Sequence, residues 1–199
     1  MTIGVLALQG AFAEHIQVLQ RLGVLCREIR QSADFAPDLD GIVLPGGEST
    51  VIGKLLEDTA LLLPISNAIR SGLPAFGTCA GMILLAKEIS GSDTSYIAAM
   101  DMRVQRNAYG RQLGSFSTTG LFADIGEIPM TFIRAPNVES VWNDSEVLAV
   151  VNDKIVAARQ GNLLATAFHP ELTDSTLVHE YFLAMTGTLK RDPVRKYQG

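Results

Sequence analysis

The stretch Leu73-Pro74-Ala75-Phe76, followed at once by Gly77-Thr78-Cys79-Ala80-Gly81, decides the fold. Its first part is a short apolar run, which predicts a buried strand. A helical pattern from Met82 to Glu88 follows the second part. A strand that passes through a tight, glycine-bounded turn into a helix is the repeating unit of α/β sheets.

The same alternation of strand and helix extends back to the N-terminus. Further strands are predicted at Ile3–Leu8, from Val24 onward and at Gly41–Leu44, with helices at Ala11–Leu22, Ser49–Asp58 and Pro64–Arg70. Apolar strands joined by helices favour right-handed crossovers and a parallel sheet that is covered on both faces.

Beyond Gly91 the pattern changes to short strands with turns between them. These strands are predicted at Met100–Gln105, Ser115–Thr118, Met130–Ile133, Val147–Val151, Ile155–Arg159 and Leu163–Ala167, with hairpin turns at Asn152-Asp153 and Gln160-Gly161-Asn162 and a last helix at Ser175–Met185. We therefore expect antiparallel additions to the same sheet. The prediction is one α/β domain over residues 1–199, a three-layer sandwich whose residues 188–199 form a flexible basic tail.

Composition limits the class of protein but not its chemistry. Hydrophobic residues make up 47% of the 199 residues and the formal net charge is −5, which argues against non-specific binding to nucleic acid or anionic lipid. Cys26 and Cys79 are the only cysteines, too few for a disulfide framework, and no apolar run reaches ~18 residues. We expect a cytoplasmic protein. Because the sequence has no metal-binding motif, we expect no metal and no cofactor.

Cys79 stands at the centre of a Gly-x-Cys-x-Gly turn between a strand and a helix. This is the form of a nucleophile elbow, in which small flanking residues let a strained turn hold the nucleophile above the sheet. The helix N-terminus favours a thiolate, and the N–H of Ala80 is placed to donate to an oxyanion. The alternative, a buried cysteine in an ordinary turn, is less consistent with glycines on both sides.

A cysteine nucleophile needs a base, and the chain offers three histidines. His15 and His179 fall in helical patterns, where we expect surface or partly buried side chains. His169 follows an apolar strand and is fixed by Pro170, and Glu171 is placed to orient its ring.

Pro45-Gly46-Gly47-Glu48-Ser49-Thr50 follows a further strand. Paired glycines let backbone N–H groups approach a ligand, so Gly47 is a candidate second oxyanion donor. The segment lacks the Gly-Lys-Ser/Thr ending of a phosphate loop. With Cys79 and His169, it lies where open α/β sheets bind ligands, beyond the carboxyl ends of the strands. Covalent acyl chemistry is the prediction that the residues support by themselves.

These motifs together resemble the class I glutamine amidotransferases, and within them the glutaminase subunits of pyridoxal phosphate synthases. The resemblance covers nearly the whole chain. It rests on Leu8–Ala11, Pro45–Thr50, Phe76–Gly81, Gly91–Asp93, Arg106-Asn107 with Gly110-Arg111-Gln112, Phe132–Pro136 and His169–Thr173.

The resemblance implies a flavodoxin-like fold and a glutaminase mechanism. Cys79 would form a glutamyl thioester, His169 would transfer protons, and Glu171 would orient His169. Glutamine would bind among Gly47, Glu48, Ser49, Arg106, Ile133 and Arg134. The implied partner is a barrel-shaped synthase in a hetero-oligomer, which uses the ammonia to make pyridoxal phosphate (vitamin B6). We further hypothesise that docking of this synthase completes the oxyanion hole at Gly46-Gly47.

Other interpretations remain open at this stage. One is a different cysteine hydrolase on a similar sheet, such as a peptidase-like or chaperone-like relative. Another is a regulatory or scaffolding module with a degenerate site, although the intact set of Cys79, His169 and Glu171 argues against degeneracy. The sequence leaves undecided which arginine binds the carboxylate of glutamine.

Overall fold

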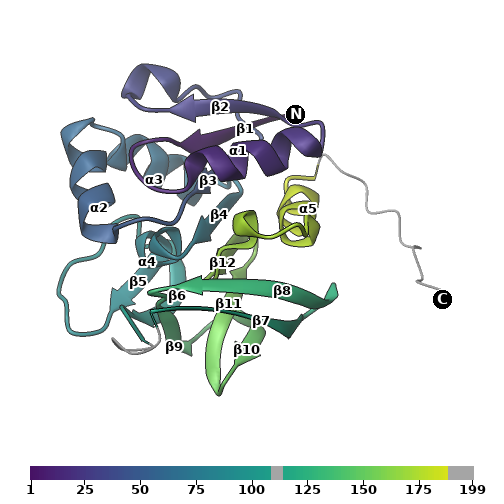
Figure 1. Cartoon of the computed structure of the whole chain (residues 1–199). Coiled ribbons are helices and arrows are strands. Elements are labelled where there is room, and N and C mark those ends of the chain that lie inside the picture. Colours follow the sequence, from purple (N-terminus) through teal and green to yellow (C-terminus); the bar gives the residue numbers. More distant parts are fainter. Residues whose placement is uncertain (109–113, 188–199) are drawn as a thin grey trace.

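A parallel half-sheet positions the predicted site residues (Figure 1). In the computed structural model, which describes residues 1–108 and 114–187, its strands lie in the order β2-β1-β3-β4-β12. Their bounds are β1 Thr2–Leu6, β2 Leu25–Ile29, β3 Gly41–Leu44, β4 Ala75–Thr78 and β12 Leu163–Thr166. This is the flavodoxin-like strand order. From β1 the chain adds β2 on one side and β3 on the other, and a crevice opens between β1 and β3 at the carboxyl ends of these parallel strands.

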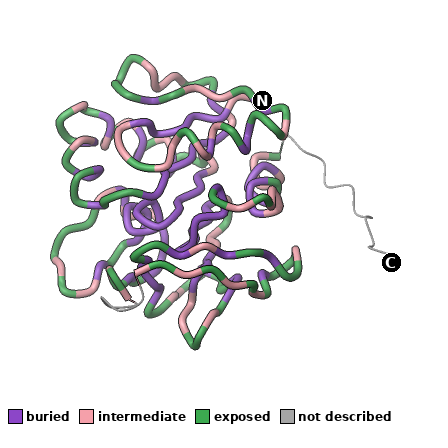
Figure 2. Tube along the Cα trace, in the orientation of Figure 1, coloured by how far each residue is buried: buried purple, intermediate pink, exposed green. Residues whose placement is uncertain are grey.

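Helices cover both faces of this half-sheet. Helices α1 and α5 lie on one face, and α2, α3 and α4 lie on the other (Figure 1). Their bounds are α1 Phe12–Arg21, α2 Ser49–Asp58, α3 Leu62–Arg70, α4 Ala80–Leu85 and α5 Leu177–Met185, with short 3-10 turns η1 Ser32–Asp34 and η2 Pro170–Leu172. The strands between them form the buried layer that Figure 2 shows in purple, and every residue of β3, β4 and β12 is buried. The prediction of a covered parallel sheet is confirmed.

Antiparallel strands extend the sheet beyond β12, as predicted. The path continues through β11 Lys154–Gln160, β10 Glu146–Val151, β7 Ser115–Phe122 and β8 Gly126–Ile133. A branch adds β5 Ala86–Ile89, β6 Met100–Gln105 and β9 Asn137–Val141. Within the described residues these strands and the parallel half form one 12-stranded sheet.

Two element predictions were wrong. The helix predicted to reach Glu88 ends at Leu85, and Ala86 is extended, with φ −66° and ψ 138°. From there the chain forms β5, which pairs in parallel with β6, so long-range pairing overrides a local helical pattern. Strand β9 was not predicted, because its Asn, Glu and Ser residues give no apolar alternation; pairing with β6 and β11 stabilises it.

Two predictions fall outside the described residues: the Gly110-Arg111-Gln112 segment and the basic tail at 188–199. Over the described ranges, 1–108 and 114–187, none of the helices combines the length and the hydrophobicity needed to cross a bilayer.

Candidate active site

Cys79 lies at the tip of a strained turn between β4 and α4. Its backbone has φ 49° and ψ −100°, a conformation that is costly for a residue with a side chain. Neither of the flanking glycines, Gly77 and Gly81, has room for a side chain. A Cβ at Gly81 would lie 1.9 Å from the carbonyl oxygen of Leu44, and one at Gly77 would lie 2.5 Å from the carbonyl carbon of Gly81. The elbow geometry predicted from the sequence is therefore present.

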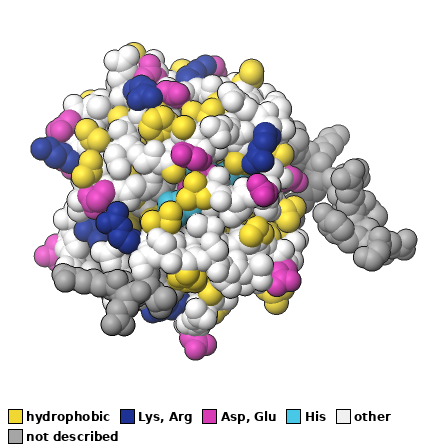
Figure 3. Space-filling view, viewed as in Figure 1, with side chains coloured by type: hydrophobic (Ala, Val, Ile, Leu, Met, Phe, Trp, Pro, Cys, Tyr) yellow, Lys and Arg dark blue, Asp and Glu magenta, His cyan; other side chains and the backbone are white. Residues whose placement is uncertain are grey.

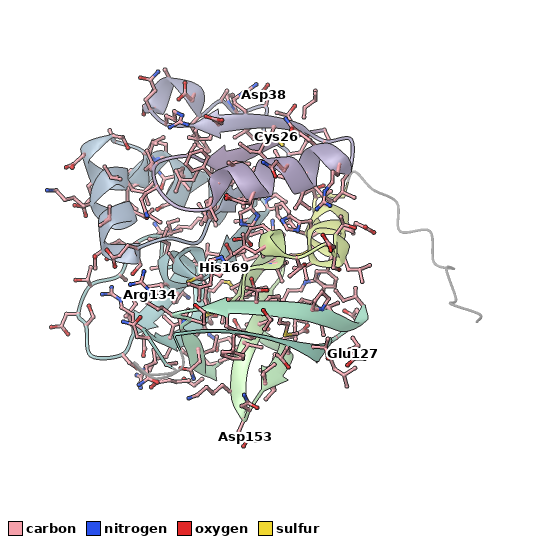
Figure 4. The ribbon with its side chains drawn as sticks, viewed as in Figure 1. Cys26, Asp38, Glu127, Arg134, Asp153 and His169 are labelled. Carbon is pink, nitrogen blue, oxygen red and sulfur yellow. The ribbon has the colours of Figure 1, made fainter. Side chains whose placement is uncertain are left out.

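The neighbouring strand β12 supplies the base. Nδ1 of His169 lies 2.6 Å from Oε1 of Glu171, and both side chains are buried. The backbone N–H of His169 donates to the carbonyl of Thr131 at 2.8 Å, which ties the residue to β8. Figure 4 shows His169 near the middle of the molecule, with Arg134 at the adjoining end of β8.

The electrostatic surroundings favour a charged imidazole at His169. Burial lowers its pKa, but hydrogen bonds to Cys79 and Glu171, together with their charges, outweigh burial and raise the pKa to about 10. The carboxyl group of Glu171 is also buried, which raises its pKa, yet His15 and His169 bring the pKa below its usual value. An imidazolium held between a cysteine sulfur and a carboxylate stabilises negative charge on the sulfur, which is how a histidine activates a cysteine nucleophile.

The Gly46-Gly47 loop after β3 is held by the loop that follows β1. The carbonyl of Gly46 accepts a hydrogen bond from Ala11 N–H at 3.0 Å, and Glu48 N–H donates to Oε1 of Gln9 at 2.8 Å. No role was predicted for Gln9 from the sequence. The sequence feature that could have identified Gln9 is the Leu8-Gln9-Gly10-Ala11 motif at the end of a strand, where ligand-binding loops lie.

The side chain of Glu48 caps helix α2. Its carboxylate accepts hydrogen bonds from the backbone N–H groups of Thr50 (3.3 Å) and Val51 (2.9 Å) and from the Thr50 hydroxyl. Burial raises the pKa of Glu48, but these hydrogen bonds and the nearby charge of Arg106 lower it overall. The carboxylate therefore stays ionised at the edge of the site.

Cys79, His169 and the Gly46-Gly47 loop enclose a cleft of about 360 Å³. The predicted substrate residues also line it: Gly47, Glu48, Ser49, Arg106, Ile133 and Arg134, together with Gln9, Gly10, Ala11, Ile83, Asn107 and Pro136. Ala80 and Glu171 are buried and are not among the lining residues. In the view of Figure 3, histidine atoms reach the surface near the middle of the molecule, among apolar side chains.

Two arginines bring positive charge to the cleft. Arg106 is half-buried and its Nη2 lies 3.5 Å from the hydroxyl of Tyr96; within the described part of the chain, its buried Nε has no hydrogen-bond partner. Arg134 is exposed and has a positive φ of 43°. A guanidinium with unused donors is suited to a carboxylate ligand.

The prediction for His15 and His179 was wrong. Both are fully buried, and Nδ1 of His15 lies 2.9 Å from Nε2 of His179. The sequence did indicate burial of His15, because His15 shares one face of the helix with the apolar Phe12 and Leu19, at spacings of three and four. Their polar side chains favoured the surface in the sequence analysis, but the two rings hydrogen-bond to each other inside the core.

Residues 1–108 and 114–187 contain no group of three or more His, Cys, Asp or Glu side chains placed to hold a metal ion.

Known proteins resemble this chain over nearly its whole length. A family model described as the SNO glutamine amidotransferase family matches residues 5–188. The chain is 59% identical over 188 residues to the pyridoxal 5'-phosphate synthase subunit PdxT of Streptococcus pneumoniae (strain CGSP14), covering 93% of this chain and 97% of that protein.

Solved structures share the fold. One described as a crystal structure of glutamine amidotransferase has a TM-score of 0.88 and 42% identity, covering 93% of this chain and 98% of the other. A structure of PurLQS from Thermotoga maritima has a TM-score of 0.68 at 15% identity, covering 92% of this chain and 97% of the other, which is a likeness of fold alone.

Proposed function

This chain belongs to the SNO glutamine amidotransferase family, and from that premise we propose that Cys79, His169 and Glu171 hydrolyse the side-chain amide of glutamine. The products are glutamate and ammonia, and the ammonia serves vitamin B6 synthesis. The observation that carries the proposal is the 2.6 Å contact between His169 Nδ1 and Glu171 Oε1, beside an elbow cysteine at the end of the adjacent strand.

In the first half-reaction the Cys79 sulfur, whose proton has passed to Nε2 of His169, attacks the amide carbon of glutamine. The amide oxygen becomes an oxyanion, for which the N–H groups of Ala80 and Gly47 are the candidate donors. His169 then protonates the leaving nitrogen, ammonia departs, and a glutamyl thioester remains on Cys79.

In the second half-reaction water replaces ammonia. His169 takes a proton from water as the water oxygen attacks the thioester carbon, and the proton returns to the cysteine sulfur when glutamate leaves. Glu171 keeps Nδ1 of His169 protonated, so that Nε2 is the atom that exchanges protons with substrate. The sum is glutamine plus water giving glutamate plus ammonia.

Charges around the cleft suit the amino-acid end of glutamine. Arg106 and Arg134 are candidates for the α-carboxylate, and Glu48 is the candidate for the α-ammonium, with Ser49 and Ile133 completing the walls. Arg106 is the stronger candidate for the carboxylate because its buried Nε has no partner among the described residues. An Arg106→Lys variant should then raise KM for glutamine more than Arg134→Lys does, since lysine cannot bind a carboxylate with two parallel hydrogen bonds.

The ammonia goes to a synthase partner. We propose that this partner is the barrel-shaped synthase implied by the sequence resemblance, in a hetero-oligomer that docks near the carboxyl ends of the strands. Direct transfer avoids protonation of ammonia in water. If docking completes the oxyanion hole at Gly46-Gly47, the isolated chain should hydrolyse glutamine more slowly than the complex does.

Glutamate release from glutamine, measured for this chain with and without its co-purified synthase, tests the proposal. Cys79→Ala should abolish activity in both cases, whereas Cys26→Ala, the matched control, should retain it, because Cys26 lies in β2 and burial raises the pKa of its thiol to about 11. Full activity in the Cys79→Ala protein would refute the mechanism, and equal rates with and without synthase would refute the docking step.

A further inference from the structure

Behind the triad lies a buried pair of histidines that the mechanism above does not use. We propose that His15 is a positioning residue for the reaction: it holds the second carboxylate oxygen of Glu171 and so fixes the base, His169. The inference rests on the proposed glutaminase function and deepens it.

The geometry forms an unbroken chain from the base into the core. Oε1 of Glu171 contacts Nδ1 of His169 at 2.6 Å, and Oε2 lies 3.4 Å from Nε2 of His15. The same Nε2 lies 3.1 Å from the hydroxyl of Thr78, the residue before the nucleophile. On its other side, Nδ1 of His15 meets Nε2 of His179 at 2.9 Å. In the described part of the chain, Oε2 of Glu171 makes no hydrogen bond, so the ion-pair contact with His15 at 3.4 Å is the polar contact that the structure gives it.

The hydrogen positions follow from the partners. Nε2 of His15 must carry a proton, because a lone pair there would face the carboxylate of Glu171. Burial lowers the pKa of His15, so the ring is neutral and its Nδ1 is an acceptor. His179 must then donate from Nε2, which leaves its own buried Nδ1 as an acceptor with no partner among residues 1–108 and 114–187. A charged His15 would instead leave a buried N–H donor of His179 unpaired, which is the costlier arrangement.

The surroundings hold His15 in one position. Its side chain from α1 is fully buried, and the ring packs edge-on against Phe76 of β4, with centroids 5.8 Å apart. His179 from α5 packs against the same phenyl ring at 5.6 Å. Packing holds the His15 ring in place, so Glu171 has a partner in a fixed position. A water molecule in the same place could exchange and would not fix the carboxylate in this way.

Few other charges act on this cluster. His169 and His15 are the titratable groups that act on Glu171. Glu14 also acts on His15, and Arg21 acts on His179, both from α1. Loss of the His15 contact leaves the Glu171 carboxylate with His169 and a backbone N–H, and removes the Nε2–H that His15 points at Oε2. The pKa of Glu171 should rise, and the acid limb of the kcat/KM profile should move to higher pH.

A pair of amide substitutions tests the proposal. In His15→Asn the side-chain oxygen stands where Nδ1 stands and still accepts from His179, but the amide is too short to reach Glu171. In His15→Gln the amide nitrogen reaches the position of Nε2. We expect His15→Asn to lower kcat about 10-fold or more, with KM for glutamine within about 2-fold of wild type and the acid limb of the kcat/KM profile at higher pH. We expect His15→Gln to keep most of the wild-type kcat and the wild-type position of the acid limb.

Phe182→Leu is the packing control. Phe182 is fully buried on α5 and contacts Phe76, with ring centroids 5.6 Å apart, but it has no polar link to Glu171. It should lower the melting temperature and leave the acid limb in place. The proposal is overturned if His15→Asn keeps the wild-type kcat and pH profile, or if His15→Asn and His15→Gln lose activity equally.

A readout that needs no glutamine separates this inference from the proposed function. The rate of Cys79 alkylation by iodoacetamide against pH, in a Cys26→Ala background, reports the thiol and its base directly. An unchanged alkylation profile in His15→Asn would overturn the positioning role even if the wild-type protein did not hydrolyse glutamine. Absence of glutamine hydrolysis by the wild-type complex would instead contradict the proposed function alone.

Discussion

Gly46→Ala should inactivate the enzyme by displacing His169, although Gly46 is not a catalytic residue. A Cβ at this position would lie 2.3 Å from Cε1 of the His169 ring, 2.9 Å from Nδ1 and 3.2 Å from Nε2. Carbon atoms in contact prefer about 3.5 Å, so the ring must retreat by about 1.2 Å or the loop must move by as much. The backbone of Gly46 does not have a positive φ, so the effect is one of space and not of backbone strain.

A retreat of that size breaks the alignment on both sides of the ring. The 2.6 Å hydrogen bond between His169 and Glu171 would lengthen, and Nε2 would leave the path between Cys79 and the leaving nitrogen. Misplacement of a reacting group by about 1 Å costs roughly 100-fold in rate, which corresponds to about 2.7 kcal/mol in the activation free energy. We therefore expect kcat to fall about 100-fold, with KM for glutamine changed far less.

The assay is glutamate release under saturating glutamine, with the synthase present, together with the melting temperature of each variant. Gly120→Ala in β7 is the control, since its Cβ would meet the flexible end of Met130 at 3.2 Å, where a small adjustment suffices. It should retain kcat. A Gly46→Ala enzyme with kcat within about 2-fold of wild type would refute the placement of His169 against this loop.

Three further outcomes are expected. Glu171→Gln keeps the shape of the side chain but removes the charge that stabilises the imidazolium, so kcat should fall about 100-fold or more in the same assay. Gly53→Ala would place a Cβ 1.9 Å from Cε1 of Tyr96, whose hydroxyl contacts Arg106, so KM for glutamine should rise several-fold while Cys79 alkylation stays unchanged. Burial holds the pKa of His179 well below its ordinary value of 6.5, so below that pH the unfolded chain binds more protons than the folded chain. The free energy of unfolding should then fall as pH drops, by up to about 1.4 kcal/mol per pH unit; urea titrations at several pH values measure this slope, which a His179→Leu variant should flatten.

Local patterns predicted most of the parallel half of the fold. Strand β3 and helix α2 have the predicted bounds, Gly41–Leu44 and Ser49–Asp58, because an apolar run and a capped amphipathic stretch each carry their own signal. The prediction was wrong at Ala86, where a helical pattern gives way to a strand. There the decisive interaction is pairing with Met100, which is distant in the sequence.

The sequence also pointed to Cys79, His169 and Glu171 as candidates, since each follows an apolar strand and the glycine spacing around Cys79 is that of an elbow. His15 and His179 were predicted to be at the surface or partly buried, because a lone polar residue in a helical pattern carries no information about a partner 164 residues away.

The sequence by itself determined the order of strands and helices in the parallel half, the candidate nucleophile and the strand ends at which the candidate base and oxyanion loop lie. Those features depend on residue type and on spacing within about ten residues, which the chain carries locally. Only the tertiary structure decided that Gly46 must be small because the ring of His169 lies against it, and that Gln9 and Ala11 hold the Gly46-Gly47 loop. It also joined His15 to Glu171 through the core. Contacts of this kind arise when packing brings distant segments within hydrogen-bonding distance, so no local pattern records them.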